Sequence, residues 1–240
     1  MAFHYSPKVT SDGLVFCVDP VNPKSYIGSG SYSTDIITKK TGSLLNGAYY
    51  SSDSFVFDGV NDYIDFGYIS ELDLTRFTVS VWYNPTTFST WHTIIDRRFG
   101  SVSDTQTHFC IMINSTQVDA FTSNGSTFKE VYLTGLNITT NTWYNFILSY
   151  DGTSLRFYIN GNLSGTLTDT FTPYTTGNQD MSIGRKNSTG GQYYTQGKIS
   201  HTTIYNRALS QTEITQNFNA LRGRFGIWVL MVVQKLYQMV

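Results

Sequence analysis

Apolar and polar residues alternate along most of this chain with a period of two. The run FTVSVWY at residues 77–83 shows the pattern most clearly, because Phe77, Val79, Val81 and Tyr83 fall on one face. Similar runs cover residues 92–96, 108–113, 118–122, 143–150 and 154–159. Side chains of a β-strand point alternately to its two faces, so this pattern predicts half-buried strands rather than helices.

Two tight turns connect these runs. Asn160 and Gly161 separate two apolar runs, and an Asn-Gly pair is a strong hairpin signal because both residues tolerate a positive φ. Leu155, Phe157 and Ile159 should then face the core. The second turn covers residues 58–62, DGVND, where we expect Gly59 to hold a conformation that other residues resist.

One short helix is predicted near the end of the chain. Ser210 and Glu213 have the spacing of a capping box, the apolar residues that follow recur at helical intervals, and Gly223 ends the run. Residues 25–46 and 184–197 are rich in Gly, Ser and other polar residues, and both segments are expected to be long surface loops.

The composition fits one all-β domain. The 240 residues include 17 Tyr and 16 Phe, which favour strands, and the low fraction of charged residues, 14%, argues against disorder. With a net charge of −1 and no basic stripe, we expect no nucleic-acid partner. Cys17 and Cys110 lie in apolar runs and are interpreted as buried free thiols, with a disulfide as the alternative.

The ends of the chain carry further expectations. The first residues lack the apolar segment of a signal peptide, and no apolar run approaches the ~20 residues of a membrane span, so we expect synthesis in a host cytoplasm. A domain is predicted at residues 1–227, followed by an apolar tail at 228–240. The tail must be covered, either by its own domain or by docking on a neighbouring subunit.

Three segments together resemble a known family. They are the turn region 54–66, the Trp143–Gly161 unit with its x-x-Y-x-N-G hairpin, and the closing segment 197–214. They are similar to the signatures of the laminin-G-like branch of the concanavalin A-like lectin/glucanase superfamily. The resemblance covers about residues 14–227 and implies a two-sheet antiparallel jelly-roll sandwich with one short C-terminal helix.

The same resemblance suggests a biological setting. Residues 14–26 and 217–227 look like the start and end of such domains in tailed-phage virion proteins. This implies a virion protein whose partners are other virion proteins or copies of itself. We therefore expect a virion surface or decoration protein that binds glycans or a host surface. A purely structural virion component and a glycoside hydrolase are the alternatives.

Catalytic motifs are scarce. Glucanases of the superfamily place carboxylates on one strand in the pattern E-x-D-x-x-E, where they act as nucleophile and acid. The three Glu residues here, Glu71, Glu130 and Glu213, have no carboxylate partner at that spacing. No nucleophile elbow, phosphate loop or metal-spaced His pair occurs. We therefore expect a protein that is not an enzyme.

Calcium is the one cofactor that the resemblance raises. Asp58, Asn61 and Asp62 offer oxygen ligands in one turn, but Asp and Asn also stabilise turns by bonding their own backbone. The family's closing G-x-I-D-E pattern has Ser200 and His201 in its acidic positions here. We therefore expect no cofactor, with calcium as the alternative.

Glycan-binding sites combine aromatic faces, which stack on sugar rings, with side chains that bond hydroxyl groups. Six loop residues are the candidates for such a site: Trp91, Arg97, Arg185, Asn187, Tyr193 and Tyr194. In a chain with 17 Tyr, ordinary strand packing is the alternative role for each tyrosine.

Overall fold

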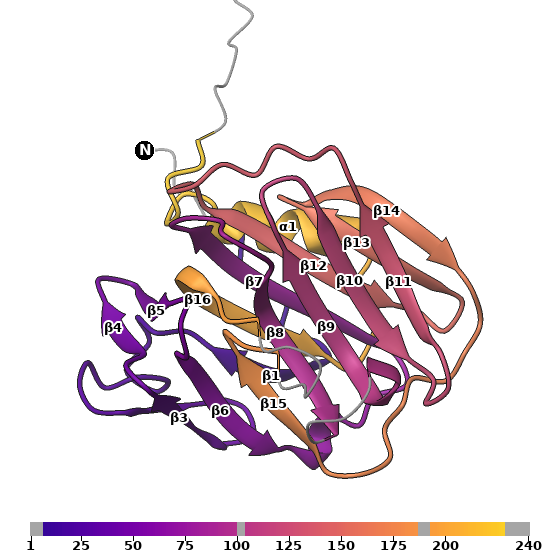
Figure 1. Ribbon diagram of the computed structural model, residues 1–240, viewed down its shortest axis with the longest axis horizontal. Helices are drawn as coiled ribbons and strands as arrows, with labels where there is room; N and C mark the ends of the chain where they lie inside the picture. Colours follow the sequence, from indigo (N-terminus) through magenta and orange to yellow (C-terminus); the bar gives the residue numbers. More distant parts are fainter. Residues whose placement is uncertain (1–6, 100–103, 187–192, 229–240) are drawn as a thin grey trace, which may run out of the picture.

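The computed structural model describes residues 7–99, 104–186 and 193–228, which form two antiparallel sheets packed face to face (Figure 1). Sheet A has the order β14 (Asn162–Thr168), β13 (Ser154–Ile159), β12 (Tyr144–Tyr150), β7 (Phe77–Pro85), β16 (Gln196–Tyr205), β5 (Ser54–Asp58) and β4 (Tyr49–Ser51), and β1 (Leu14–Val18) also pairs with β16. Sheet B has the order β11 (Phe128–Leu133), β10 (Val118–Ser123), β9 (Thr107–Ile113), β8 (His92–Phe99), β15 (Gln179–Ile183), β6 (Tyr63–Tyr68), β3 (Thr41–Leu45) and β2 (Tyr32–Thr34). Short 3₁₀ turns, η1 (Ser70–Leu72) and η2 (Asp104–Gln106), lie in the connections. The predicted two-sheet sandwich is confirmed.

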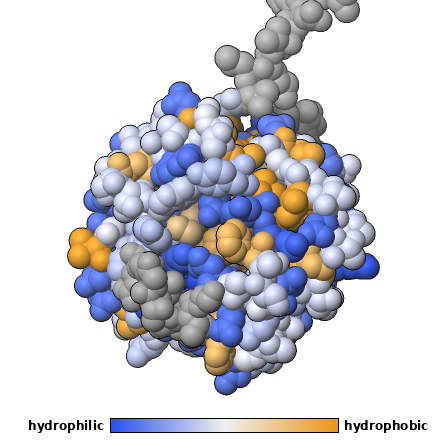
Figure 2. Space-filling model, turned by 45° about the vertical axis from the view of Figure 1, so that its right-hand side comes forward, coloured by the Kyte–Doolittle hydropathy of each residue, from blue (hydrophilic) through white to orange (hydrophobic). Residues whose placement is uncertain are grey.

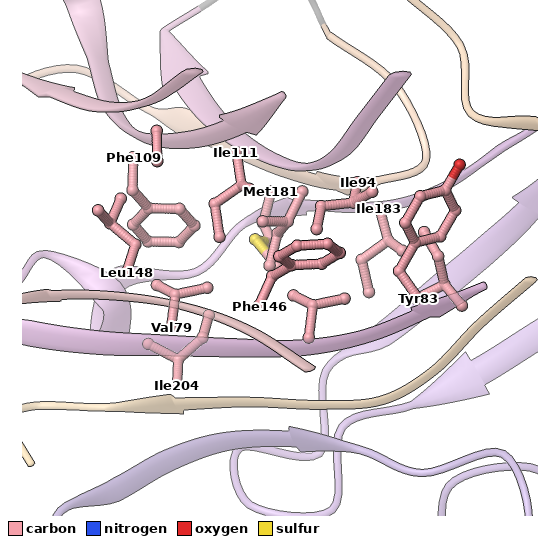
Figure 3. Packing of buried hydrophobic residues seen from close by; sticks show 14 of the residues in the cluster. Val79, Tyr83, Ile94, Phe109, Ile111, Phe146, Leu148, Met181, Ile183 and Ile204 are labelled. Atoms are coloured by element: carbon pink, nitrogen blue, oxygen red, sulfur yellow. The ribbon is translucent and has the colours of Figure 1, made fainter. Parts of the chain in front are cut away.

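The core lies between the two sheets. Figure 3 shows Phe109, Ile111 and Met181 of sheet B pointing toward Val79, Phe146 and Leu148 of sheet A. All of these side chains are buried, and they belong to one continuous cluster. The alternation seen in the sequence therefore selects the inner face of each strand, and burial of these side chains is the main driving force for the sandwich.

The middle of the outer face of sheet A is also covered. The helix α1 (Gln211–Leu221) and the turn after it pack on this face, where Trp82 stacks on Phe218 and Phe225 at ring distances of 5.7 and 4.1 Å. For this reason every residue of β7 is buried, including those that alternate away from the core. The cover does not extend to the edges of the sheet, because β14 and β4 keep exposed residues.

The predicted helix and turns are confirmed. Ser210 caps α1 through a full capping box with Glu213. Asn160 and Gly161 have φ values of 52° and 80°, as the hairpin between β13 and β14 requires. Gly59 also has a positive φ, 80°.

Other expectations are corrected or fall outside the description. The predicted loop at residues 25–46 contains β2 and β3, which pair with each other. Cys17 and Cys110 are buried free thiols, as predicted.

The predicted tail 228–240 lies outside the described residues from 229 onward, and Trp228, which precedes them, is 79% exposed. In the described part of the chain, no helix has the length and apolar character needed to cross a membrane.

Candidate functional site

The outer face of sheet B carries an apolar cluster built from β9 and β10. Val118 and Ala120 face the core, so Phe121 points outward, where it packs against Cys110 and Met112. Trp91 and Tyr193 pack on this cluster from two different connections. The structure thus brings together two of the predicted site residues that are more than 100 positions apart in sequence.

Trp91 also forms one wall of a groove, which we call the Trp91 groove. The groove has a volume of about 290 Å³ and lies between the β7–β8 connection and the β9–β10 turn. Its lining consists of two aromatic rings with hydroxyl and amide side chains: Phe88, Ser89, Thr90, Trp91, Asn114, Ser115 and Thr116. Figure 2, turned to bring the side with β11 and β14 forward, shows apolar surface among polar surface.

Hydrogen bonds fix the wall of the groove opposite Trp91. Asn114 N donates to Gln117 O at 3.0 Å, and Thr116 N donates to Asn114 Oδ1 at 2.9 Å. Gln117 Nε2 donates to the hydroxyl of Tyr132 at 2.7 Å, and the Tyr132 ring lies 6.4 Å from that of Trp91. The groove is therefore formed before any ligand arrives, and its aromatic surface extends onto β11. Tyr132 is not among the predicted site residues, because β11, the strand that carries it, was not predicted from the sequence.

Arg185 and Tyr194 lie close together at the base of the 187–192 connection, where they form an isolated bridge. The Arg185 guanidinium lies 3.6 Å from the centre of the Tyr63 ring and 3.8 Å from Asp65. The Tyr194 ring lies 6.5 Å from the Tyr63 ring. These predicted residues are therefore adjacent to each other, and Arg185 already has partners. Asn187 lies outside the described residues.

Arg97 is not a loop residue, so this part of the prediction is wrong. It lies in β8 with 0% exposure and donates hydrogen bonds to His108 Nδ1 at 2.7 Å, Gln179 Oε1 at 2.8 Å and Asp73 Oδ1 at 2.6 Å. A buried guanidinium is stable only when paired in this way. Burial first, and the charge of Arg97 second, lower the pKa of His108 to about 3. Arg97 therefore stabilises the fold and does not reach a ligand.

A second charged cluster lies beside the apolar one. Arg98 is fully buried and pairs with both oxygens of Asp96, at 2.5 and 2.9 Å, and with Asp104 at 2.8 Å. Lys186 Nζ lies 3.0 Å from Asp104. Burial alone would lower the pKa of Arg98, but these carboxylates hold it above its usual value. Arg98 thus remains charged and in place.

Two carboxyl groups meet on adjacent strands of the same face. In the β10–β11 register Asp119 is opposite Tyr132 and Glu130 is opposite Phe121, so the two acids are diagonal neighbours. Burial, followed by the charge and hydrogen bond of Glu130, raises the pKa of Asp119 to about 7. The pattern along a single strand does not reveal this pair, because the two acids lie on different strands.

The turn at residues 58–62 uses its acidic side chains on its own backbone. Asp58 Oδ1 accepts from Val60 N at 2.8 Å, and Asp62 Oδ2 accepts from Asp58 N at 3.0 Å. Asp62 Oδ1 is buried without a hydrogen-bond partner. Two of the turn's carboxylate oxygens are therefore engaged by its own backbone, which is the turn-stabilising role expected of Asp side chains. Within the described ranges, no group of three or more His, Cys, Asp or Glu is placed to hold a metal ion.

A sequence comparison identifies a related family. The profile described as "Concanavalin A-like lectin/glucanases superfamily" matches residues 58–215, which is more than half of the chain. No curated protein matches the chain.

Comparison with solved structures shows the same fold in carbohydrate-related proteins. A Trypanosoma rangeli sialidase matches with a TM-score of 0.68 and 15% identity over 92% of this chain, which spans 36% of the sialidase. Domain 4 of AbnA, an extracellular GH43 arabinanase from Geobacillus stearothermophilus, solved with arabinotriose, matches with a TM-score of 0.61 and 18% identity over 85% of this chain and 97% of the domain. The binding domain of botulinum neurotoxin DC, solved with SialylT, matches with a TM-score of 0.63 and 12% identity over 88% of this chain and 52% of that one. At these identities the likeness establishes the fold alone.

Proposed function

The chain belongs to the concanavalin A-like lectin/glucanases superfamily, and from this premise we propose that it is a glycan-binding module that does not cleave its ligand. The proposed binding site is the Trp91 groove with the adjoining aromatic surface of sheet B. Arabinotriose bound to domain 4 of the arabinanase and SialylT bound to the toxin domain support a glycan as the class of ligand.

The observation that carries the proposal is the lining of the Trp91 groove. Sugar rings have apolar faces that stack on aromatic side chains, and their hydroxyl groups pair with hydroxyl and amide groups. Trp91 supplies the ring, while Asn114 and Thr116 lie on the opposite wall. Hydrogen bonds hold the 114–117 turn, so little conformational entropy would be lost on binding.

Glycoside hydrolysis is the second candidate function, and the observation that favours it is the Asp119–Glu130 pair. Hydrolases of sugars use two carboxyl groups about 5–5.5 Å apart, or farther, with the reacting atoms between them. Neither Asp119 nor Glu130 lines the Trp91 groove, so the pair is not among the groups that would meet a sugar bound there. We therefore favour binding over cleavage.

We also propose that the module is carried on a virion made in a host cytoplasm, next to other virion proteins or copies of itself. Two observations support this setting: the resemblance of residues 14–26 and 217–227 to tailed-phage domains, and the exposure of Trp228 at the start of the apolar segment. Immunogold electron microscopy of purified particles tests it. Particles without label would contradict this setting but would leave the glycan site untouched.

The glycan proposal is tested on a printed glycan array. The wild-type protein should bind a defined subset of glycans, and Trp91→Ala should lose that binding. Tyr49→Ala is the matched control, because Tyr49 is an exposed aromatic residue on β4 of the other sheet. Equal binding by wild type and Trp91→Ala would contradict the proposed site.

Cleavage is tested on the glycans that bind. Release of reducing sugar should stay at background for the wild-type protein. Release that disappears in both Asp119→Asn and Glu130→Gln would instead establish the hydrolase.

A further inference from the structure

A second groove lies at the opposite end of β10. It has a volume of about 370 Å³ and is formed by the β10–β11 turn and the segment that precedes β15. We call it the Tyr174 groove. Its lining again combines apolar rings with hydroxyl and amide groups: Asn124, Gly125, Ser126, Thr172, Pro173, Tyr174, Thr175 and Thr176.

The turns that form the two grooves share one hydrogen-bond pattern. In the Trp91 groove, Asn114 N donates to Gln117 O at 3.0 Å and Asn114 Oδ1 accepts from Thr116 N at 2.9 Å. In the Tyr174 groove, Asn124 N donates to Thr127 O at 3.2 Å and Asn124 Oδ1 accepts from Ser126 N at 3.0 Å. Each turn therefore begins with an Asn whose side-chain oxygen is used within the turn, and each presents small polar side chains to its groove.

An aromatic residue from a distant segment faces each turn. Tyr174 corresponds to Trp91 and is held firmly, because its N donates to Ser123 O at 2.6 Å and its carbonyl accepts from Gln179 Nε2 at 3.0 Å. Its ring lies so close to Gly125 that a Cβ on that glycine would stand 2.9 Å from it. Gly125, with φ of 91°, thus lets the aromatic ring meet the turn.

The chemistry of the linings specifies a class of ligand. Neither set of lining residues contains an ionisable acid or base other than the tyrosine hydroxyl. A charged sugar would find no counter-charge in either groove, whereas a neutral sugar finds stacking surface and hydroxyl partners. At ~3.3 Å per residue, the six residues of β10 separate the two turns by about 20 Å, so the grooves are distinct sites.

We propose that the Tyr174 groove is a second binding site and that the chain binds neutral oligosaccharides at both ends of β10. This inference rests on the proposed glycan-binding function and adds to it the number of sites and the class of sugar. Two sites on one rigid strand make the chain bivalent, so it can hold two branches of a glycan surface more tightly than one site could.

The test is a ¹⁵N–¹H NMR titration of the full chain with arabinotriose, maltotriose and cellotriose, and with sialyllactose as the charged comparator. At least one neutral trisaccharide should shift the amide signals of both turns, 114–117 and 124–127. Trp91→Ala should abolish the shifts of the first turn only, and Tyr174→Ala those of the second turn only. Each variant is its own folding control, because the signals of the other turn must keep responding.

The outcomes separate the inference from the proposed function. Shifts confined to residues 114–117 would contradict a second site and leave the Trp91 groove standing. Stronger shifts with sialyllactose than with the neutral sugars would contradict the ligand class. An absence of shifts with all four sugars would contradict both the second site and the proposed function.

Discussion

At Gly59 both the backbone and a neighbouring strand exclude a side chain. Its φ is 80°, and a Cβ would lie 2.7 Å from that of Gln196 on β16. We predict that Gly59→Val lowers the free energy of unfolding by about 1 kcal/mol or more, measured by chemical denaturation. Gly28→Ala is a useful reference, since Gly28 has a φ of 88° but open space around it. If both variants cost the same, the contact with Gln196 contributes nothing.

Asp119 should make stability depend on pH. Its pKa is about 7 in the folded protein against an ordinary value of 3.8, so between these two pH values the folded state binds more protons than the unfolded state. The contribution of Asp119 to the free energy of unfolding therefore falls as the pH rises from about 4 to about 7. We predict that Asp119→Asn is more stable than wild type at pH 8 and equally stable at pH 4.

The comparison of Asp119→Asn with wild type must be made at each pH separately. Burial lowers the pKa of His92 and His201 to about 4, so their contribution to stability is lost as the pH falls from 6.5 toward 4. This effect opposes that of Asp119 but is common to both proteins. A difference in melting temperature that stays constant from pH 4 to 8 would show that Asp119 does not titrate as described.

Among the elements, α1 depends on its first turn. The Ser210 side chain accepts a hydrogen bond from Glu213 N, and the Glu213 carboxylate accepts one from Ser210 N. The same carboxylate forms an ion pair with Arg207 at 2.5 Å. We predict that Ser210→Ala lowers the free energy of unfolding by about 1 kcal/mol, measured by chemical denaturation. Ser164→Ala on the exposed strand β14 should cost less. Equal costs would mean that the cap is unimportant.

Most elements could be predicted because their signals are local. Alternation marked the inward residues of β7 and β13, and the Asn160–Gly161 pair marked a hairpin. The same signal occurs at Asn124–Gly125, and with it β11 and Tyr132 could have been found. The burial of Arg97 could not be predicted, because it depends on Asp73 and Gln179, which only the folded sheets bring to it.

The candidate site could be predicted only in part, because only some of its signals are local in the sequence. Aromatic residues in connections were identifiable, and Trp91 and Tyr193 do share one cluster. The groove itself needs the 114–117 turn, which lies opposite Trp91 only after β8 and β9 pair. Pairing between strands, not the pattern within a strand, decides which polar residues meet.

For the whole molecule, the apolar segment after Trp228 is the remaining element to account for. Trp228 is 79% exposed, although α1 already covers the middle of the outer face of sheet A. We predict that a chain truncated after Ile227 keeps its melting temperature but loses self-association on a sizing column. A truncated chain with an unchanged elution volume would contradict docking between subunits, and an unfolded one would place the segment in the domain's own core.

Titration calorimetry of the strongest array glycan against wild type and Trp91→Ala tests the central claim most directly. A groove that binds sugar through Trp91 predicts saturable binding by the wild-type protein and a loss of affinity of about tenfold or more in the variant, equivalent to ~1.4 kcal/mol. Tyr49→Ala should bind like wild type. An unchanged dissociation constant in a folded Trp91→Ala variant would contradict the account.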